Sequence, residues 1–145
     1  MNFKDGILSL GIAEVIASLS SDDIKMEYLS HFDDNESKKI IIMSLSSDEK
    51  KIELMKSLED YYHWEIISSL SSDETKVDML TTLPDIYGKD LHKSLIIASM
   101  SSEYPQLREL ISEIEDENLR TVLEACFSDD DGRVDALKKI VLLKI

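Results

Sequence analysis

The chain has 145 residues, of which 43% are apolar and 32% are charged, and it contains only four Gly and two Pro. This composition is that of a globular domain rather than a disordered chain, and the scarcity of turn residues disfavours a β fold. The 30 acidic and 16 basic side chains leave a net charge of −14, which disfavours direct binding to nucleic acid or to an anionic membrane surface.

The hydropathy and the cysteine content bear on where in the cell the protein is expected. No apolar run approaches the ~20 residues of a membrane span, and the N-terminal apolar segment is interrupted by Asp5 and Glu14. The single Cys126 cannot form an internal disulfide. We therefore expect a cytoplasmic, intracellular protein that neither enters nor binds a membrane.

One short segment recurs along the chain: SLSSDD at 18–23, and SLSSDE at 44–49 and 69–74. Taking its leucine as a mark, weaker copies follow in ASMSSEY and ACFSDDDG. The marks are Leu19, Leu45, Leu70, Met100 and Phe127, at intervals of 26, 25, 30 and 27 residues. Apolar residues recur four positions before each mark and seven and ten positions after it, so the sequence is an internal repeat.

Each repeat is predicted to hold two helices in chain order. The first ends at the mark with an apolar stripe over 15–19, 41–45, 66–70, 96–100 and 123–127. The second carries apolar residues three apart over 26–32, 52–58, 77–83, 107–114 and 134–140, which is one face of a helix. Polar breaks separate the repeats at 33–37, 59–63, 84–90 and 115–118. The isoleucine run at 40–42 would also suit a buried strand.

The serine-rich segment itself is typical of a tight turn between the two helices. A serine one place after the mark is followed three residues later by an acid, which is the spacing of a capping box. We therefore expect these serines to be helix N-caps: Ser20, Ser46, Ser71 and Ser128. The same pattern also resembles acid-directed phosphorylation sites, and SDDDGRVD at 128–135 resembles a loose calcium site.

A second polar pattern lies inside the second helices. Six residues after the marks stand Lys25, Lys51, Lys76, Gln106 and Arg133, and an aspartate precedes each basic residue by three: Asp22, Asp48, Asp73 and Asp130. This spacing predicts a ladder of exposed ion pairs within each helix. The alternative is a cationic stripe that binds acidic peptides.

No motif for catalysis or for a cofactor stands out. The three histidines are not at metal-ligand spacing, and HxxxH, CxxC, HExxH, a glycine-rich phosphate loop and GxSxG are all missing from the sequence. We therefore expect no enzyme activity, no catalytic residue, no bound cofactor and no metal site.

These features predict an all-α fold, in which about five two-helix repeats of ~25–30 residues form a right-handed stack over a single domain, residues 1–145. The pattern resembles an α-solenoid in the broad sense of HEAT and tetratricopeptide arrays, although their units of ~40 and ~34 residues are longer. The resemblance is one of architecture and carries over no functional residues. A compact helical bundle is the alternative packing.

Such stacks typically bind proteins, so the expected function is that of a non-catalytic interaction scaffold. The candidate partner-binding residues are the aromatics of the breaks, which are Tyr61, Tyr62, Trp64 and Tyr87. They would otherwise pack between repeats. The alternative function is that of an acidic inhibitor or nucleic-acid mimic that masks a basic partner. The apolar C-terminal IVLLKI further suggests a homo-oligomer or an end-to-end contact through the C-terminal helix.

Overall fold

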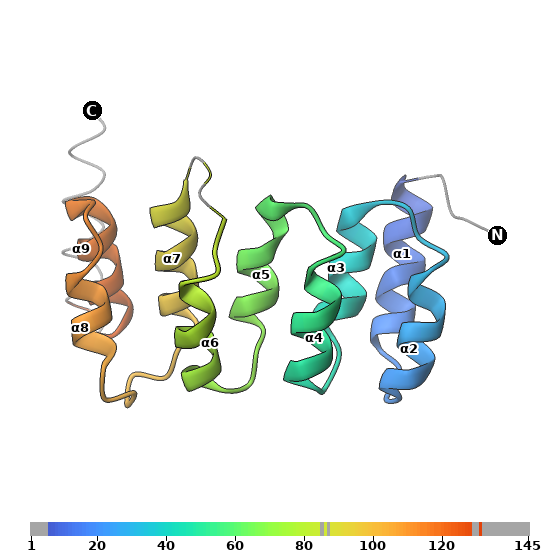
Figure 1. Ribbon diagram of the computed structural model, residues 1–145, viewed down its shortest axis with the longest axis horizontal. Helices are drawn as coiled ribbons and strands as arrows, with labels where there is room; N and C mark the ends of the chain where they lie inside the picture. The colour runs from blue at the N-terminus through green and yellow to red at the C-terminus, as the bar shows by residue number, and fades with distance from the viewer. Residues whose placement is uncertain (1–5, 85, 87, 129–130, 132–145) are drawn as a thin grey trace. The chain divides into compact units, whose positions relative to one another are not determined.

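The computed structural model describes residues 6–84, 86, 88–128 and 131, and every secondary-structure element in them is a helix (Figure 1). The all-α prediction is confirmed, and the isoleucine run at 40–42 is helical rather than extended. The chain divides into two compact units, Met1–Pro84 and Asp85–Ile145. The single repeat domain over 1–145 stays a prediction.

The first unit contains three helical hairpins. Their helices are α1 (Gly6–Ala17) with α2 (Asp22–Leu29), α3 (Asn35–Met43) with α4 (Asp48–Met55), and α5 (His63–Ser68) with α6 (Asp73–Leu80). A short 3-10 helix, η1 (Asp60–Tyr62), precedes α5. The serine-rich turns within the hairpins lie at one edge of the unit, and the longer connections between hairpins lie at the opposite edge (Figure 1).

The hairpins of the first unit pack in a repeating way. The first helices form one layer, in which α1 contacts α3 and α3 contacts α5, while α2, α4 and α6 lie in a second layer (Figure 1). Each second helix contacts its own first helix and, for α2 and α4, the first helix of the next hairpin. A second helix therefore joins two consecutive repeats.

Apolar residues at matched positions of the repeats make the core. The adjacent isoleucines of α3 and α5 are 0% exposed: Ile41, Ile42, Ile66 and Ile67. The marks Leu45 and Leu70 are also buried. Burying each such side chain contributes about 1.5–3 kcal/mol, so the predicted stripes are the main source of cohesion.

The second unit contains α7 (Lys89–Ala98), α8 (Leu107–Ser112) and α9 (Glu117–Cys126), which contact one another. Gly88 precedes α7 with a φ of +89°, a left-handed conformation that glycine adopts without steric cost. Ile96, Ile97 and Met100 are buried at the predicted positions. Residues 134–140 and the end of the chain, with the predicted fifth second helix, lie outside the described residues.

The helix caps lie one residue later than predicted. The N-cap residues are Ser21, Ser47 and Ser72, whose hydroxyls accept from the backbone N–H three residues on, at 3.2–3.3 Å. Ser20, Ser46 and Ser71 are therefore not N-caps. The following acids then occupy the first two helical positions, where they face the positive end of the helix dipole.

The fourth predicted cap, Ser128, stays a prediction. Ser128 follows the end of α9, and its hydroxyl donates to the carbonyl of Ala125 at 2.9 Å. The hydroxyl of Ser128 thus serves the helix that ends before it. Asp131 is helical, and the residues on either side of it, 129–130 and 132–145, lie outside the described residues.

The shift of the caps can be tested in the third hairpin, which offers a matched serine pair. Ser72→Ala removes the cap hydroxyl and should lower the free energy of unfolding by about 1 kcal/mol. Ser71→Ala removes an exposed hydroxyl next to it and should change that energy by less than about 0.5 kcal/mol. Urea unfolding of the two variants measures both. A larger loss of unfolding free energy in Ser71→Ala than in Ser72→Ala would show that Ser71 is the N-cap after all.

Candidate functional site

The tight turn inside each hairpin, here called the joint, exposes two kinds of unsatisfied backbone group. Residues 44–47 form the joint between α3 and α4, and residues 69–72 form the joint between α5 and α6. The end of the first helix leaves carbonyls without partners, and the start of the second leaves N–H groups without partners. The joint therefore presents a partial negative charge beside a partial positive charge.

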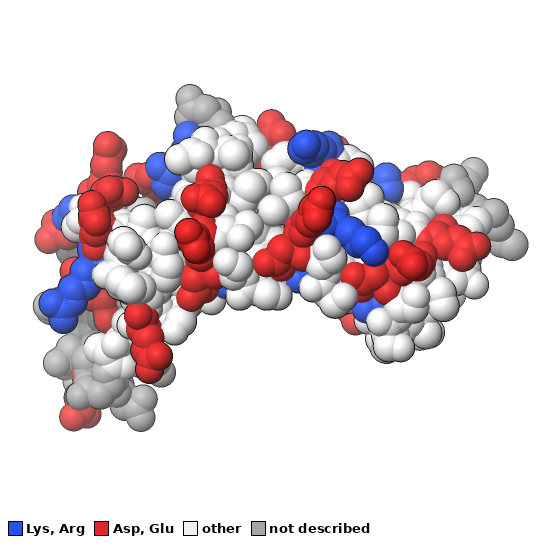
Figure 2. Space-filling view, turned by 60° about the horizontal axis from the view of Figure 1, so that its bottom comes forward, with Lys and Arg blue, Asp and Glu red and all other residues white. Residues whose placement is uncertain are grey.

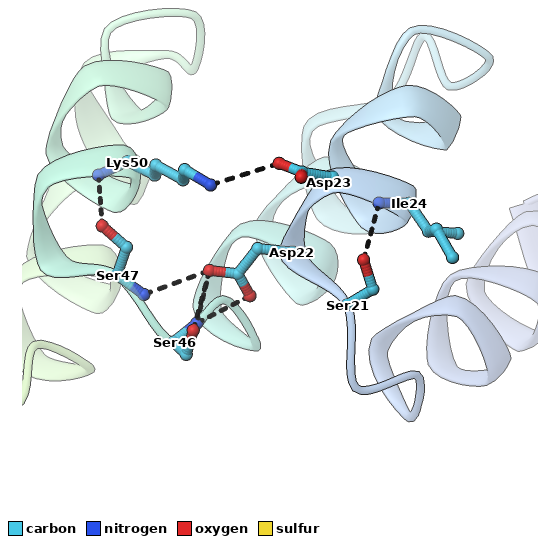
Figure 3. Close-up of polar contacts among 7 residues, drawn as sticks. All are labelled: Ser21, Asp22, Asp23, Ile24, Ser46, Ser47 and Lys50. Atoms are coloured by element: carbon cyan, nitrogen blue, oxygen red, sulfur yellow. Dashed lines mark hydrogen bonds and ion pairs between the residues drawn. The ribbon is translucent and has the colours of Figure 1, made fainter.

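Asp22, the first residue of α2, satisfies the N–H groups of the next joint (Figure 3). Its carboxylate accepts from the backbone N–H of Ser46 at 3.0 and 3.1 Å, from the Ser46 hydroxyl at 2.8 Å, and from the N–H of Ser47 at 3.3 Å. In a capping box, the acid that reaches the N-cap N–H comes from the same helix. Here it comes from the preceding repeat.

Lys25 satisfies the other half of the same joint. Its Nζ donates to the carbonyl of Ser44, the C-cap residue of α3, at 2.9 Å. A cation at a helix C-terminus interacts favourably with the helix dipole, and its hydrogen bonds to carbonyls are charge-assisted. Asp22 and Lys25, three residues apart on one helix, thus bind opposite ends of two different helices.

The arrangement repeats in the next hairpin. Asp48 accepts from the N–H groups of Ser71 at 2.8 Å and Ser72 at 3.1 Å. Lys51 donates to the carbonyl of Ser69 at 2.6 Å. We call each Asp–Lys pair, with the joint that it binds, a clamp. In α6, Asp73 and Lys76 keep the same spacing, and their charged groups are 3.8 Å apart.

The clamps shift the ionisation of their members. The backbone hydrogen bond from Ser46 is the main cause that lowers the pKa of Asp22 below its usual value, against the opposing effect of burial. Burial lowers the pKa of Lys51, because it disfavours the charged amine, although the neighbouring Asp48 and Asp22 oppose this.

These contacts correct the predicted ladder of exposed ion pairs. Lys25, Lys51 and Lys76 are buried, at 4–5% exposure, and bring no charge to the surface. Asp73–Lys76 forms the predicted pair, although in a buried position, whereas Asp22–Lys25 and Asp48–Lys51 are not among the ion pairs of the described residues. The fourth pair, Asp130–Arg133, lies outside the described residues. A cationic stripe for acidic peptides is excluded on the same grounds. The signal in the sequence was that the aspartate and the lysine keep the same spacing in three repeats, while the residue just before the lysine varies.

The exposed face of the second helices is acidic. Two rows of exposed carboxylates, four residues apart on each helix, cross α2, α4 and α6. They consist of Asp23, Glu49 and Glu74, and of Glu27, Glu53 and Asp78. We call these six residues the acidic face. Figure 2 shows bands of Asp and Glu over the first unit, from left of the centre of the view to its right-hand side, with few Lys or Arg between them.

The burial of the lysines makes this face more acidic than the composition suggests. Residues 1–84 hold 17 acidic and 8 basic side chains, a net charge of −9. Three of the eight are the buried lysines of the second helices. Lys50 forms an ion pair with Asp23 of the preceding repeat, with Nζ 3.4 Å from the carboxylate oxygen.

A second cluster lies at the opposite edge, where α3 meets α5. Lys39 Nζ is 2.8 Å from Glu36 and 2.9 Å from Glu65, and it lies 5.6 Å from the centre of the Tyr62 ring. Burial lowers the pKa of Lys39, but its bonds to the two glutamates outweigh this and leave the pKa raised. Burial, followed by the charge of Glu36, raises the pKa of Tyr62.

Three of the four predicted partner-binding aromatics lie in η1 and α5, the segment that gives Tyr62 and Glu65 to this cluster. Tyr61 is 59% exposed and makes an edge-to-face contact with Tyr62, with ring centres 5.7 Å apart. Tyr62 and Trp64 are half-buried. Tyr87 lies outside the described residues. Tyr61 therefore offers an accessible ring, whereas Tyr62 is held by Lys39.

The described part of the chain shows no gathering of three His, Cys, Asp or Glu side chains suited to a metal ion. Within the same residues, no helix has the length and apolar character that crossing a membrane requires. Comparison with known proteins found no matching family model, no matching curated protein and no matching solved structure.

The clamp predicts a pH-dependent stability. Because folding lowers the pKa of Asp22, its ionised form stabilises the protein above the ordinary carboxyl pKa of about 3.9, and this contribution is lost as the pH falls through the lowered pKa. Asp22→Asn should therefore unfold at lower urea than the unmodified protein at pH 7. The difference should shrink at about pH 2.5.

Asp23→Asn is the matched control, since the Asp23 side chain is 91% exposed and its ion pair is a surface one. It should leave the urea midpoint nearly unchanged at pH 7. Equal losses in the two variants would show that Asp22 acts only through net charge.

Proposed function

We propose that this protein is a non-catalytic interaction module in which about five helical hairpins form a right-handed α-solenoid. The contacts of the first unit support this stack, since α2 and α4 each pack on the next hairpin and clamp its joint. A regular stack of this kind displays its second helices as a continuous surface.

We further propose that the acidic face is the partner-binding surface and that the partner is a basic protein. The observation that carries this proposal is the separation of charge. Three lysines of the second helices, Lys25, Lys51 and Lys76, are buried, while the acids four residues apart stay exposed. A fourth, the half-buried Lys50, pairs with Asp23. Complementary charge across an interface speeds association and selects the partner.

The placement of the acids supports a role beyond solubility. Like charges four residues apart on a helix are neighbours and destabilise it by a few tenths of a kcal/mol. All three second helices of the first unit carry such a pair. Solubility requires only net charge and could be met by acids at any exposed position. Pairs of acids at the same positions of three successive helices are instead expected of a surface that binds cations.

A partner that normally binds nucleic acid is the narrower version of this proposal. Rows of carboxylates on one face would occupy the phosphate sites of such a protein and inhibit it. This version requires that nucleic acid and the present protein compete for the partner. The exposed Tyr61, at the opposite edge, stays a candidate for a separate contact.

The acidic face can be tested with a lysine- and arginine-rich peptide as the basic probe, by fluorescence anisotropy at low and at moderate salt. Neutralising three carboxylates of the face should weaken binding about tenfold at low salt, because the lost charges would meet the probe directly. The substitutions are Glu49→Gln, Glu53→Gln and Asp78→Asn.

A control with the same net charge separates the face from the overall field. It neutralises three exposed acids outside the face, Glu14→Gln, Glu59→Gln and Asp60→Asn. This variant should bind the probe almost as the unmodified protein does. If both triple variants lose affinity equally, the probe responds to net charge and the acidic face is not a site.

A further inference from the structure

The first hairpin exposes a surface that the next two hairpins bury. Val15 of α1 is 67% exposed, whereas its equivalents Ile41 and Ile66 are 0% exposed. The mark Leu19 is 39% exposed, against 3% for Leu45 and 4% for Leu70. Tyr28 of α2 is 44% exposed, while its equivalents are half-buried. We call Val15, Leu19 and Tyr28, with the first joint, the receiving edge.

The polar groups of the receiving edge are those that a clamp satisfies elsewhere. The first joint, residues 18–21, contains the carbonyl of Ser18 and the N–H groups of Ser20 and Ser21, which correspond to Ser44, Ser46 and Ser47 of the second. Within the described residues, no side chain donates to Ser18 or accepts from these two N–H groups. The edge therefore combines exposed apolar side chains with the acceptor and donors of an unfilled clamp.

The chemistry of the missing occupant follows from the two filled clamps. It is a helix that begins with an aspartate and carries a cation three residues later. In the internal clamps, those residues are Asp22 with Lys25, and Asp48 with Lys51. An apolar residue directly after the cation, Met26 or Ile52, is half-buried in the same helices.

Besides Asp73 and Lys76 of α6, the chain carries a copy of this pattern near its C-terminus. Counted from the mark Phe127, Asp130 and Arg133 stand at the positions of Asp22 and Lys25. Val134 then matches Met26, and Leu137 matches Leu29. These four residues lie outside the described ones, so the match is one of sequence. An arginine supplies the same charge with more N–H donors than a lysine does.

We propose that residues 127–137 of a second copy of this chain bind the receiving edge of the first, with Asp130 accepting from the Ser20 and Ser21 N–H groups and Arg133 donating to the Ser18 carbonyl. The contact continues the internal repeat from one molecule into the next. Its two surfaces differ, so it is head-to-tail and builds open chains or closed rings rather than a two-fold dimer.

Sedimentation velocity of the full chain, over a range of micromolar concentrations, tests the assembly. The unmodified protein should form species larger than a dimer as its concentration rises. Val15→Asp, which places a charge on the exposed receiving edge, should raise the dissociation constant at least tenfold. Tyr61→Asp, at a position that is also exposed (59%) but away from the receiving edge, should leave the dissociation constant unchanged. Circular dichroism should show the same helicity in all three proteins.

A mixing experiment tests the polarity of the contact. Asp130→Lys combined with Arg133→Glu should also abolish assembly, as should the milder pair Asp130→Asn and Arg133→Met, which guards against misfolding of the segment. A one-to-one mixture of Val15→Asp with either double variant should form a dimer and stop there, because only one compatible pair of surfaces remains.

Three results would overturn the proposal. The first is an unmodified chain that stays monomeric at high micromolar concentration. The second is a double variant that assembles as the unmodified chain does, which would indicate a two-fold contact through the receiving edge alone. The third is a mixture of the two kinds of variant that stays monomeric.

Discussion

The clamp is the interaction on which the repeat depends, because a tight joint between two helices cannot satisfy its own backbone. Four residues connect α3 to α4, and they leave carbonyls of one helix beside N–H groups of the next. The carboxylate of Asp22 and the amine of Lys25 supply the two opposite charges that this arrangement requires. The joint can stay short and serine-rich because the preceding repeat completes it.

This device also distributes the charge of the protein. Each repeat of the first unit buries a lysine of its second helix, and in the first two repeats a backbone carbonyl accepts a hydrogen bond from that lysine. The two carboxylates of the acidic face in each repeat stay exposed. An acidic surface then follows from the packing of the repeats as well as from composition. The acids that define the proposed binding face and the lysines that hold the stack are thus parts of one helix pattern.

The clamp has a direction, since the second helix gives the charged groups and the next joint receives them. Among the described residues of the first unit, the second and third joints are filled, whereas the first joint lies next to exposed Val15 and Leu19 and has no such contact. Polarity of this kind distinguishes a repeat array from a two-fold symmetric assembly. It also explains why the same residue type, such as leucine at the mark, is exposed in one hairpin and buried in the next two.

The sequence by itself determined the helices, the breaks between them and the apolar columns, because these follow from local periodicity and from matched positions such as Leu45 and Leu70. It did not determine the partners of Asp22 and Lys25. Their spacing within one helix satisfies the rule for an ion pair, and only the placement of the next joint beside α2 shows that each binds a different helix end. The cap lies at Ser47 rather than Ser46, and the same shift to Ser21 occurs in the first joint, which no clamp fills within the described residues, so the shift does not depend on the clamp.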